Sequence, residues 1–369
     1  MEKIKHIALI EPVGGHGGMD YYDYGLAYGL GANNVSIDYH TCSKTRKRTF
    51  SNVTTYYTFK DLWSYAKWKK FYLFLKYYRN AIRQSKKAKC DLVHFHFFSF
   101  SIPNLIVLWL CSANKMKSIV TVHDVDSFHG KTIPLVEKLS YRLIDGIIVH
   151  NHSSYSALNA KKLKLPKTAI IPHGNYTPFV KQLPLPVSKE PVELLFFGQI
   201  KEVKGLDILL KAFAKAIKQN KNFKLTIAGR PWKTELQKYK QLIEELNIAD
   251  FVETHFRYIP DEEVEQFYAK AHIVVLPYRR IYQSGVLLLT MSYGRTAITS
   301  NLPAFTEIVV NNKNGLIFES ESVESLAHTI LNLTCEKITQ TTSQAMETIK
   351  YKFDWVNIGK QTKDFYENL

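Results

Sequence analysis

Residues 3–42 read KIKHIALIEPVGGHGGMDYYDYGLAYGLGANNVSIDYHTC, and this stretch predicts the fold. The apolar run over residues 3–10 is typical of a buried strand, and a loop with four glycines and one histidine follows it. Residues 22–33 predict a helix that ends in glycine, and residues 35–42 predict a second strand. A strand, a glycine-rich turn and a helix form the first unit of a parallel α/β sheet.

The same alternation recurs along the chain. In the first half, further strands are predicted at residues 90–98, 117–125, 141–151 and 167–175. Three prolines without periodicity mark a linker at 181–191. Beyond it, strands are predicted at residues 192–200, 223–229, 251–256, 272–278, 296–300 and 315–319. We therefore expect an α/β protein of two Rossmann-like, doubly wound parallel-sheet domains, residues 1–182 and 192–350, joined by residues 183–191.

Composition limits the class of protein. The chain has 369 residues, 46% of them hydrophobic, and no run of about 18 apolar residues that would predict a transmembrane helix. The first residues are charged and then alternate like a strand, which is not the pattern of a signal peptide. The four cysteines, Cys42, Cys90, Cys111 and Cys335, form no CxxC pair and are expected as free thiols in a reducing cytosol.

The positive charge is concentrated in one segment. The whole chain has a net charge of +16, and residues 44–89, expected as an insert in the first domain, carry fourteen Lys or Arg, twelve aromatic residues and a single acid, Asp61. Cations interleaved with Trp and Tyr are typical of an anionic membrane surface. Nucleic acid is a competing partner, and a solvated basic helix with inward-packed aromatics is a further alternative.

Several familiar motifs are absent. The first turn lacks G-x-G-x-x-G, which argues against hydride transfer, and no P-loop occurs. Without HExxH or paired cysteines, we expect neither a metal nor another cofactor, and without GxSxG we expect no hydrolase elbow.

Three stretches carry candidate chemistry. In residues 196–213, Lys204 opens a helix, where its charge adds to a dipole end that favours anions. In residues 277–309, the amides of Ser284, Gly285 and Val286 start an apolar helix beside Arg279 and Arg280. In residues 118–130, His123 and Asp124 directly follow a strand. The alternatives are a solvated lysine beside a turn glycine and a structural histidine.

Together these motifs resemble a GT-B fold glycosyltransferase of the family-four, nucleotide-sugar-dependent group. The resemblance spans nearly the whole chain and includes DLVHFH, TVHD, IPHG, FFG…KG, IAG, LPY, SGVLLLTMSYG and TEIV. It implies that the second domain binds most of the nucleotide and the first binds most of the acceptor. It also implies that the last segment, residues 351–369, forms a helix that crosses back to the first domain.

The residues and the resemblance together nominate a site. His123 and Lys204 are the expected catalytic residues, the lysine stabilising the leaving diphosphate. Substrate contacts are expected from Gly14, Gly15, His16, Gly17, Gly18, Asp124, His173, Gly198, Gln199, Gly229, Arg230, Arg257, Tyr258, Arg279, Gln283, Ser284, Gly285, Val286 and Glu307.

The sequence departs from the family pattern in two places. Gln199 stands where the family usually has an arginine. Ile281 and Leu289 occupy the positions of two glutamates that usually contact the donor sugar and the ribose, so the chain resembles a variant with a QSG-type turn.

The resemblance implies transfer of a sugar from a UDP- or GDP-sugar to a saccharide acceptor, with retention of configuration. We expect a lipid-linked acceptor of bacterial surface polysaccharide synthesis, and a cytoplasmic protein at the inner face of the membrane. A soluble acceptor, an epimerase- or phosphorylase-like enzyme and an inactive nucleotide-binding protein are the alternatives.

Overall fold

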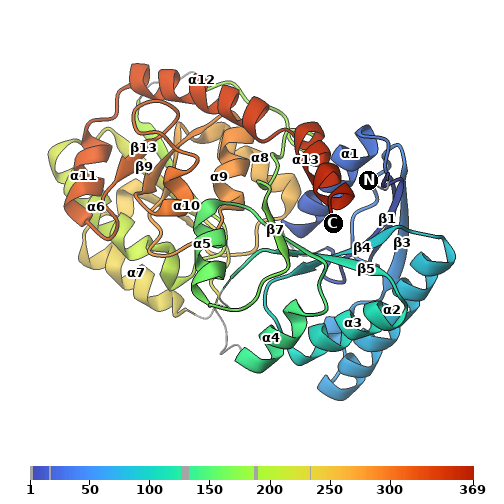
Figure 1. Cartoon of the computed structure of the whole chain (residues 1–369). Helices are drawn as coiled ribbons and strands as arrows, with labels where there is room; N and C mark the ends of the chain where they lie inside the picture. Colours follow the sequence, from blue (N-terminus) through green and yellow to red (C-terminus); the bar gives the residue numbers. More distant parts are fainter. Residues whose placement is uncertain (1–2, 16–17, 126–132, 187–189, 233) are drawn as a thin grey trace. The chain divides into compact units, whose positions relative to one another are not determined.

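The computed structural model describes residues 3–15, 18–125, 133–186, 190–232 and 234–369, and it divides into two compact units (Figure 1). Unit 1 comprises residues 1–174 and 353–369, and unit 2 comprises residues 175–352. Each unit contains one parallel sheet with helices on its faces, so the expected α/β class with two doubly wound sheets is confirmed.

Unit 1 has seven parallel strands in the order β3-β2-β1-β4-β5-β6-β7. Their bounds are β1 His6–Ile10, β2 Ser36–Cys42, β3 Val53–Phe59, β4 Leu92–Phe97, β5 Lys117–Val122, β6 Gly146–Val149 and β7 Lys167–Ile170. The helices are α1 Met19–Ala32, α2 Lys67–Lys87, α3 Ile102–Ala113, α4 Pro134–Tyr141, α5 His152–Ala160 and α13 Trp355–Glu367, with the 3-10 turn η1 Leu62–Ser64. The central strands β1, β4, β5 and β6 are largely buried because helices cover both faces of the sheet, whereas the edge strands β3 and β7 are partly exposed.

Residues 44–89, expected as an insert, are part of the sheet itself. They supply the edge strand β3, which pairs in parallel with β2, and the helix α2, which leads the chain back to β4. Tyr78, Ala81 and Ile82 of α2 are buried, and most of its basic residues point to solvent. This helix is therefore amphipathic, and only some of its aromatic residues pack inward.

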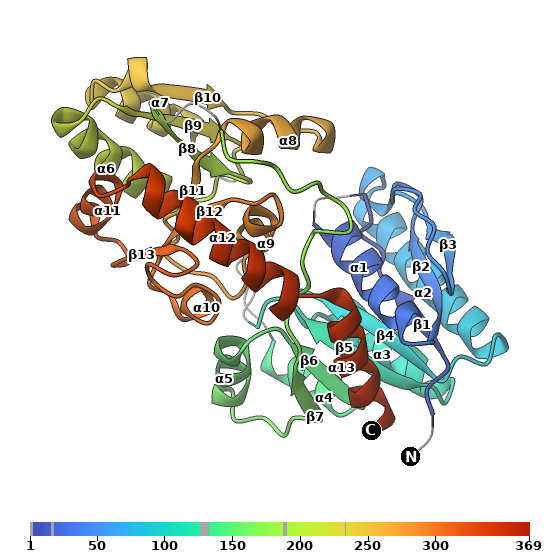
Figure 2. The same ribbon diagram turned by 90° about the horizontal axis from the view of Figure 1, so that it is seen from above.

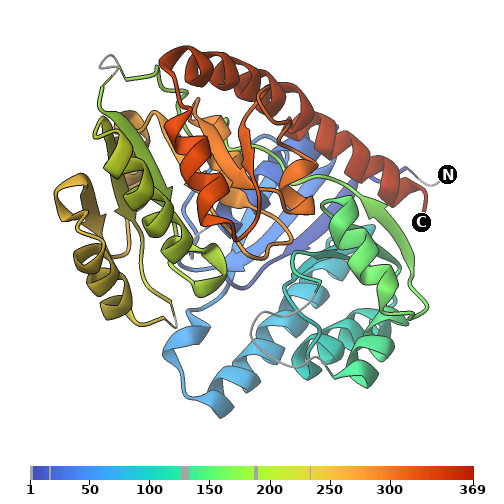
Figure 3. The same ribbon diagram turned by 90° about the vertical axis from the view of Figure 1, so that its left-hand side faces the viewer.

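Unit 2 has six parallel strands in the order β10-β9-β8-β11-β12-β13. Their bounds are β8 Val192–Phe197, β9 Phe223–Ala228, β10 Val252–His255, β11 Ile273–Leu276, β12 Thr296–Ser300 and β13 Leu316–Phe318. The helices are α6 Leu206–Gln219, α7 Leu236–Glu245, α8 Asp261–Lys270, α9 Gly285–Ser292, α10 Pro303–Thr306, α11 Val323–Leu331 and α12 Cys335–Lys352, with 3-10 turns η2 Glu202–Lys204 and η3 Ala249–Phe251. Helix α6 packs between α7 and α11, and α12 packs on α9 (Figure 3). No helix among the described residues is long and apolar enough to span a bilayer.

The C-terminal helix α13 packs on α1 within unit 1, as the resemblance implies (Figure 2). Trp355 is buried against α1, and a Cβ at Gly25 would lie 2.1 Å from its ring. A Cβ at Gly29 would lie 2.0 Å from the carbonyl oxygen of Trp355, and one at Gly359 would lie 2.1 Å from the backbone of Gly29. The two helix backbones are therefore in direct contact, which requires glycine on both sides.

Replacing Gly29 by alanine tests this contact. Helix propensity alone predicts that the free energy of unfolding rises, whereas the direct contact predicts that it falls. Alanine raises helix stability by about 1 kcal/mol in a helix interior, whereas overpacking costs about 1–3 kcal/mol. A Cβ placed 2.0 Å from backbone has no room to relax, so we expect Gly29→Ala to lower the free energy of unfolding in urea. The exposed Lys360→Ala on α13 is the control and should change stability by less than about 0.5 kcal/mol. A more stable Gly29→Ala protein would contradict the direct contact.

Candidate functional site

In unit 2, the loops that follow β8 and β9 are in backbone contact. Gly198 directly follows β8 and has a φ of 104°, and its amide donates to the carbonyl oxygen of Ala228 at 2.9 Å. A Cβ at Gly229 would lie 1.8 Å from the carbonyl oxygen of Gly198. Glycine at these two positions therefore lets the two strand ends approach each other, and the substrate contacts expected of Gly198 and Gly229 stay predictions.

Lys204 lies directly beside this contact. Its Nζ would be 3.2 Å from a Cβ at Gly198, and it sits 5.1 Å from the ring centroid of Tyr278. The turn that carries it depends on Gly205, whose φ is 65° and whose Cβ would lie 1.9 Å from the carbonyl oxygen of Pro277. Because protein surrounds the ammonium group and Lys201 adds a second positive charge nearby, the pKa of Lys204 is lowered to about 7. No described residue forms a hydrogen bond or ion pair with Nζ.

The first residues of α9 also lie beside Gly198. Val286 Cγ2 would lie 3.4 Å from a Cβ at Gly198, so Gly198, Lys204 and Val286 form one group. Ser284 caps the helix by accepting a hydrogen bond from the amide of Leu287 at 3.1 Å. The amides of Gly285 and Val286 have no acceptor among the described residues, as expected for a first helical turn.

Two polar atoms near this turn are buried without a hydrogen-bond partner in the described part of the chain. They are the hydroxyl of Tyr278 and Oε1 of Gln283. Buried polar atoms are normally satisfied, so unpartnered ones indicate a place where a ligand or water completes the network. Together with Lys204 and the free amides, they make this region of unit 2 a candidate anion site, which we call the lysine site.

Arg279 holds the turn that carries Lys204. Its guanidinium forms two hydrogen bonds with Asp207, at 2.9 and 2.7 Å, and a third with the carbonyl oxygen of Glu202 at 2.8 Å. These bonds hold the turn that carries Lys204, and they lower the pKa of Asp207. Arg279 therefore positions the turn of Lys204, and its expected contact with substrate stays a prediction.

The remaining unit 2 candidates lie around the strand ends. Gln199 is exposed, Arg230 lies over the ring of Trp232, and Arg257 forms an exposed ion pair with Glu263. Tyr258 is exposed, and Glu307 ends α10, where its carbonyl oxygen accepts a hydrogen bond from Lys352. Their contacts with substrate stay predictions.

In unit 1, a pocket of about 440 Å³ opens at the carboxyl ends of β1 and β4. These are the strands between which the strand order reverses, the usual ligand position in a doubly wound sheet. Its lining combines strand ends with α2 and the start of α3, and includes Glu11, Lys67, Lys70, Phe71, Phe74, His96 and Phe98. We call it the switch-point pocket.

Glu11 is the buried acid of this pocket. Its carboxylate accepts a hydrogen bond from the amide of Val13 at 2.7 Å. Burial, with a further contribution from Asp20, raises the pKa of Glu11 to about 8. Asp23 is buried nearby, and burial together with the charge of Glu11 raises its pKa well above the usual value. Burial therefore favours the uncharged form of the Glu11 carboxyl group, which can donate a hydrogen bond.

The glycine loop lies beside these acids, and the described part of it faces protein. A Cβ at Gly14 would lie 1.6 Å from Thr45 Oγ1, and a Cβ at Gly15 would lie 2.6 Å from Lys44. Gly18 is the residue before α1. His16 and Gly17 lie outside the described residues.

His123 belongs to a chain of buried histidines at the strand ends. Its Nε2 is 3.1 Å from Nδ1 of His96, and its Nδ1 is 3.3 Å from Nε2 of His150. His173, which continues the row, is 5.8 Å from His150 between ring centroids. Burial lowers the pKa of all four rings, so they are neutral near pH 7. Asp124, half-buried, follows His123 directly.

Sequence reasoning missed Glu11, Asp23, His96 and His150 as site residues. The signal was present, because Glu11, His96 and His150 stand at or next to the ends of apolar strands.

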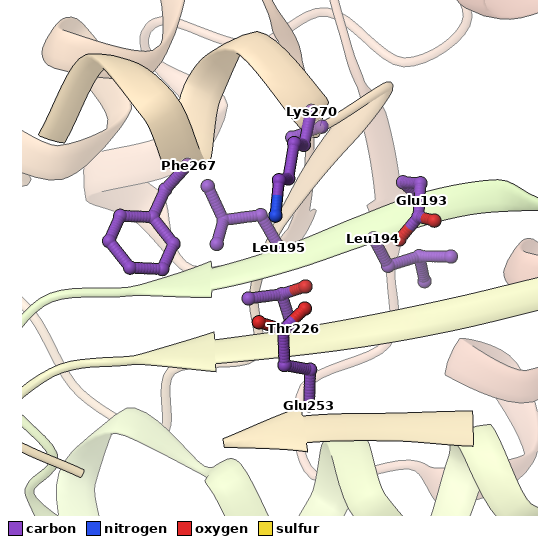
Figure 4. Close-up of a pocket in the computed structure, with 8 residues that line it drawn as sticks. Glu193, Leu194, Leu195, Thr226, Glu253, Phe267 and Lys270 are labelled. Atoms are coloured by element: carbon purple, nitrogen blue, oxygen red, sulfur yellow. The ribbon is translucent and has the colours of Figure 1, made fainter. Parts of the chain in front are cut away.

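A second hollow, between α8 and strands β8 to β10, holds only about 10 Å³ (Figure 4). None of the predicted site residues lines it.

Comparison with known proteins agrees with this architecture. The family model of Glycosyltransferase Family 4 matches residues 16–176, and that of Glycosyl transferases group 1 matches residues 182–351. A Klebsiella pneumoniae protein described as an uncharacterized 41.2 kDa protein in the cps region is 22% identical over 269 residues, 68% of this chain and 72% of that protein. The lipopolysaccharide 1,2-N-acetylglucosaminetransferase of Salmonella typhimurium is 22% identical over 61% of this chain and 62% of that enzyme.

Among solved structures, the Anabaena protein HepE in complex with UDP and glucose superposes with a TM-score of 0.74, covering 99% of this chain and 100% of that one at 16% identity. This likeness concerns the fold. With the two family models, which between them match most of the chain, it identifies the protein as a GT-B glycosyltransferase of the family-four type.

Proposed function

We propose that the enzyme transfers a sugar from a nucleoside diphosphate-sugar, and that the lysine site of unit 2 binds the diphosphate. The observation that carries this proposal is Lys204, a cation whose pKa is lowered to about 7 and which has no anionic partner among the described residues. A cation in such surroundings is stabilised when an anion binds, and the free amides of α9 add donors for phosphate oxygens. The Anabaena relative crystallised with UDP and glucose supports this class of donor.

The proposed chemistry requires little from the protein besides charge. The bond between the sugar C1 and the diphosphate breaks, and a bond from the acceptor oxygen to C1 forms. Negative charge develops on the leaving diphosphate, and Lys204 with the amides of Gly285 and Val286 stabilises it without reorganisation. The proton of the acceptor hydroxyl goes to solvent, so the products are the glycosylated acceptor and the free nucleoside diphosphate. The family resemblance supports retention of configuration.

The switch-point pocket of unit 1 is the proposed acceptor site. Its lining includes Glu11, whose uncharged form is favoured by burial, and the ring of His96, whose Nε2 has no hydrogen-bond partner among the described residues. Both groups can form hydrogen bonds with sugar hydroxyls without adding charge. Its wall on α2 combines Phe71 and Phe74 with Lys67 and Lys70. Apolar rings beside cations suit an acceptor with a lipid part and a phosphate, which supports a lipid-linked saccharide of surface polysaccharide synthesis.

The outer face of α2 and α3 supports docking on an anionic membrane. Trp68 and Tyr72 on α2 are 88% and 64% exposed, and Trp109 on α3 is 59% exposed. The two helices pack side by side, and α2 adds a dense set of lysines and arginines. Aromatic rings at headgroup level and cations near the surface both favour such a membrane.

Replacing Lys204 by methionine tests the proposed function. We expect kcat to fall about 10²–10³-fold, the usual cost of removing one preorganised donor to a developing anion. Lys211→Met, on the exposed face of α6, is the matched control and should keep full turnover. Sugar release from UDP- and GDP-sugars with a lipid-linked acceptor is the assay, and circular dichroism checks the fold. Full turnover by the Lys204 variant would rule out its proposed role.

The pKa of Lys204 predicts how donor binding depends on pH. Only the protonated amine attracts the diphosphate, and in the free protein its pKa is about 7. Above pH 7 the protonated fraction falls, so the Kd of UDP-glucose or GDP-mannose should rise about tenfold per pH unit until the pKa of the complex is reached. The diphosphate of a nucleotide sugar keeps a constant charge over this range. Calorimetric titration from pH 6 to 9 measures the slope, which Lys204→Arg should abolish; an equal slope in that variant would contradict the assignment.

Vesicle co-sedimentation tests the membrane proposal. Replacing Trp68 and Tyr72 together by serine should lower partitioning to anionic vesicles at least about tenfold, or about 1.4 kcal/mol. Salt should weaken the binding of the unaltered protein. Tyr351→Ser, an aromatic residue of unit 2 that is 68% exposed, is the control and should bind normally. Equal binding to neutral and anionic vesicles would count against an electrostatic docking face.

A further inference from the structure

Three side chains of different chemistry meet at the amino ends of the unit 1 strands, away from the carboxyl ends that carry the switch-point pocket. His6 is the first residue of β1, Asp38 lies in β2, and Cys90 precedes β4. Each offers one ligand atom, and these atoms lie within 4.8 Å of one another. In the described part of the chain, no other three His, Cys, Asp or Glu side chains meet in this way.

The separations are those of ligands around one ion. His6 Nε2 is 3.3 Å from Asp38 Oδ1, and Cys90 Sγ is 3.7 Å from His6 Nε2 and 3.8 Å from Asp38 Oδ2. Zinc bonds of about 2.0 Å to nitrogen and oxygen and about 2.3 Å to sulfur, at tetrahedral angles, place such atoms about 3.3–3.6 Å apart. Asp38 faces His6 with Oδ1 and Cys90 with Oδ2, so its carboxylate binds one ion through both oxygens or turns to offer one of them, and the three ligand atoms then lie within 4.8 Å of one another.

The backbone around the cluster fixes the positions of its members. Asp91 accepts hydrogen bonds from the amides of Lys5 and His6 at 2.8 and 2.9 Å, and its own amide donates to the carbonyl oxygen of His6 at 2.7 Å. The amide of Cys90 donates to the carbonyl oxygen of Ser85 at 3.0 Å. Asp38 pairs in register with Ala8 of β1. The three side chains are therefore held by sheet and helix backbone before any ion binds.

We propose that His6, Asp38 and Cys90 form a binding site for a zinc-like divalent cation in unit 1. Thiolate, imidazole and carboxylate are the donors that zinc accepts together, whereas magnesium and calcium prefer oxygen ligands. The His6 side chain is 28% exposed, which leaves access for a water molecule as the fourth ligand. Binding replaces the thiol proton of Cys90 by the cation, and the proton goes to solvent.

The bound ion would join β1, β2 and the loop before β4. These segments are separated in sequence by the length of α1 and by residues 43–89, so the cation acts as a cross-link between distant parts of unit 1. It lies at the opposite end of the strands from the proposed acceptor pocket. The site therefore serves stability, and its occupancy is independent of the proposed sugar transfer.

Cobalt titration of the chelator-treated full chain, carrying no histidine tag, tests the proposal. Co²⁺ should give a near-ultraviolet thiolate charge-transfer band that saturates at one ion per chain, and Zn²⁺ should abolish it by displacement. Cys90→Ser should lose the band, and Asp38→Asn should weaken Co²⁺ binding at least about tenfold. Cys335→Ser, a half-buried cysteine of unit 2, is the matched control and should keep the band.

Two further readouts separate the outcomes. Zn²⁺ should raise the Tm of the unaltered chain and of Cys335→Ser, but not that of Cys90→Ser. Circular dichroism shows whether each variant is folded, and if Cys90→Ser fails to fold, His6→Gln replaces it in both assays. Absence of a thiolate band in the unaltered chain, or a band that persists in folded Cys90→Ser, would overturn the proposal.

Discussion

The order of the strands reverses once in each sheet, between β1 and β4 and between β8 and β11, and both candidate sites depend on that reversal. Successive crossovers are right-handed, so helices before and after the reversal lie on opposite faces of the sheet. The loops leaving the two central strands therefore part and leave a space between them. In unit 1 this space is the switch-point pocket, which lies at the ends of β1 and β4. In unit 2 the loop after β8 carries Lys204, and the loop after β11 carries Tyr278 and Ser284.

Within the lysine site, the two cations next to the strand ends have different roles because one has a partner and the other does not. Arg279 is neutralised by Asp207 through two parallel hydrogen bonds, a geometry that fixes orientation as well as charge. The Arg279 amide also donates to the carbonyl oxygen of Val203 at 2.8 Å. The turn is thus anchored on both sides of Lys204, whose amine remains available. This is preorganisation: the cost of holding the ammonium in place is met during folding, before the donor binds.

Much of this arrangement follows from local sequence, and the exceptions have identifiable causes. Apolar runs predicted most of the buried strands, and the Lys204 turn and the α9 start were predicted from their residue types. Strand β3 was missed because it is a half-exposed edge strand in a basic segment, where no buried run stands out. The Arg279–Asp207 pair joins residues 72 positions apart, and the histidine chain joins residues 27 apart, so both depend on strand register. The contact of Gly14 with Thr45 depends likewise on how the loop packs. The glycine content of the loop alone could not show whether its backbone faces another part of the protein or a ligand.

The two sites differ in charge in the way that the proposed reaction requires. Burial raises the pKa of Glu11 and lowers that of His96, so it favours the uncharged forms of these two polar groups in the lining of the switch-point pocket. These groups can exchange hydrogen bonds with neutral hydroxyl groups at little desolvation cost, and the cations of the pocket, Lys67 and Lys70, lie apart from them on the α2 wall. The lysine site instead contains an ammonium group and free amides. Among the described residues, no carboxylate forms an ion pair with Lys204. This difference supports the proposal that the diphosphate binds in unit 2 and the acceptor hydroxyl groups in unit 1.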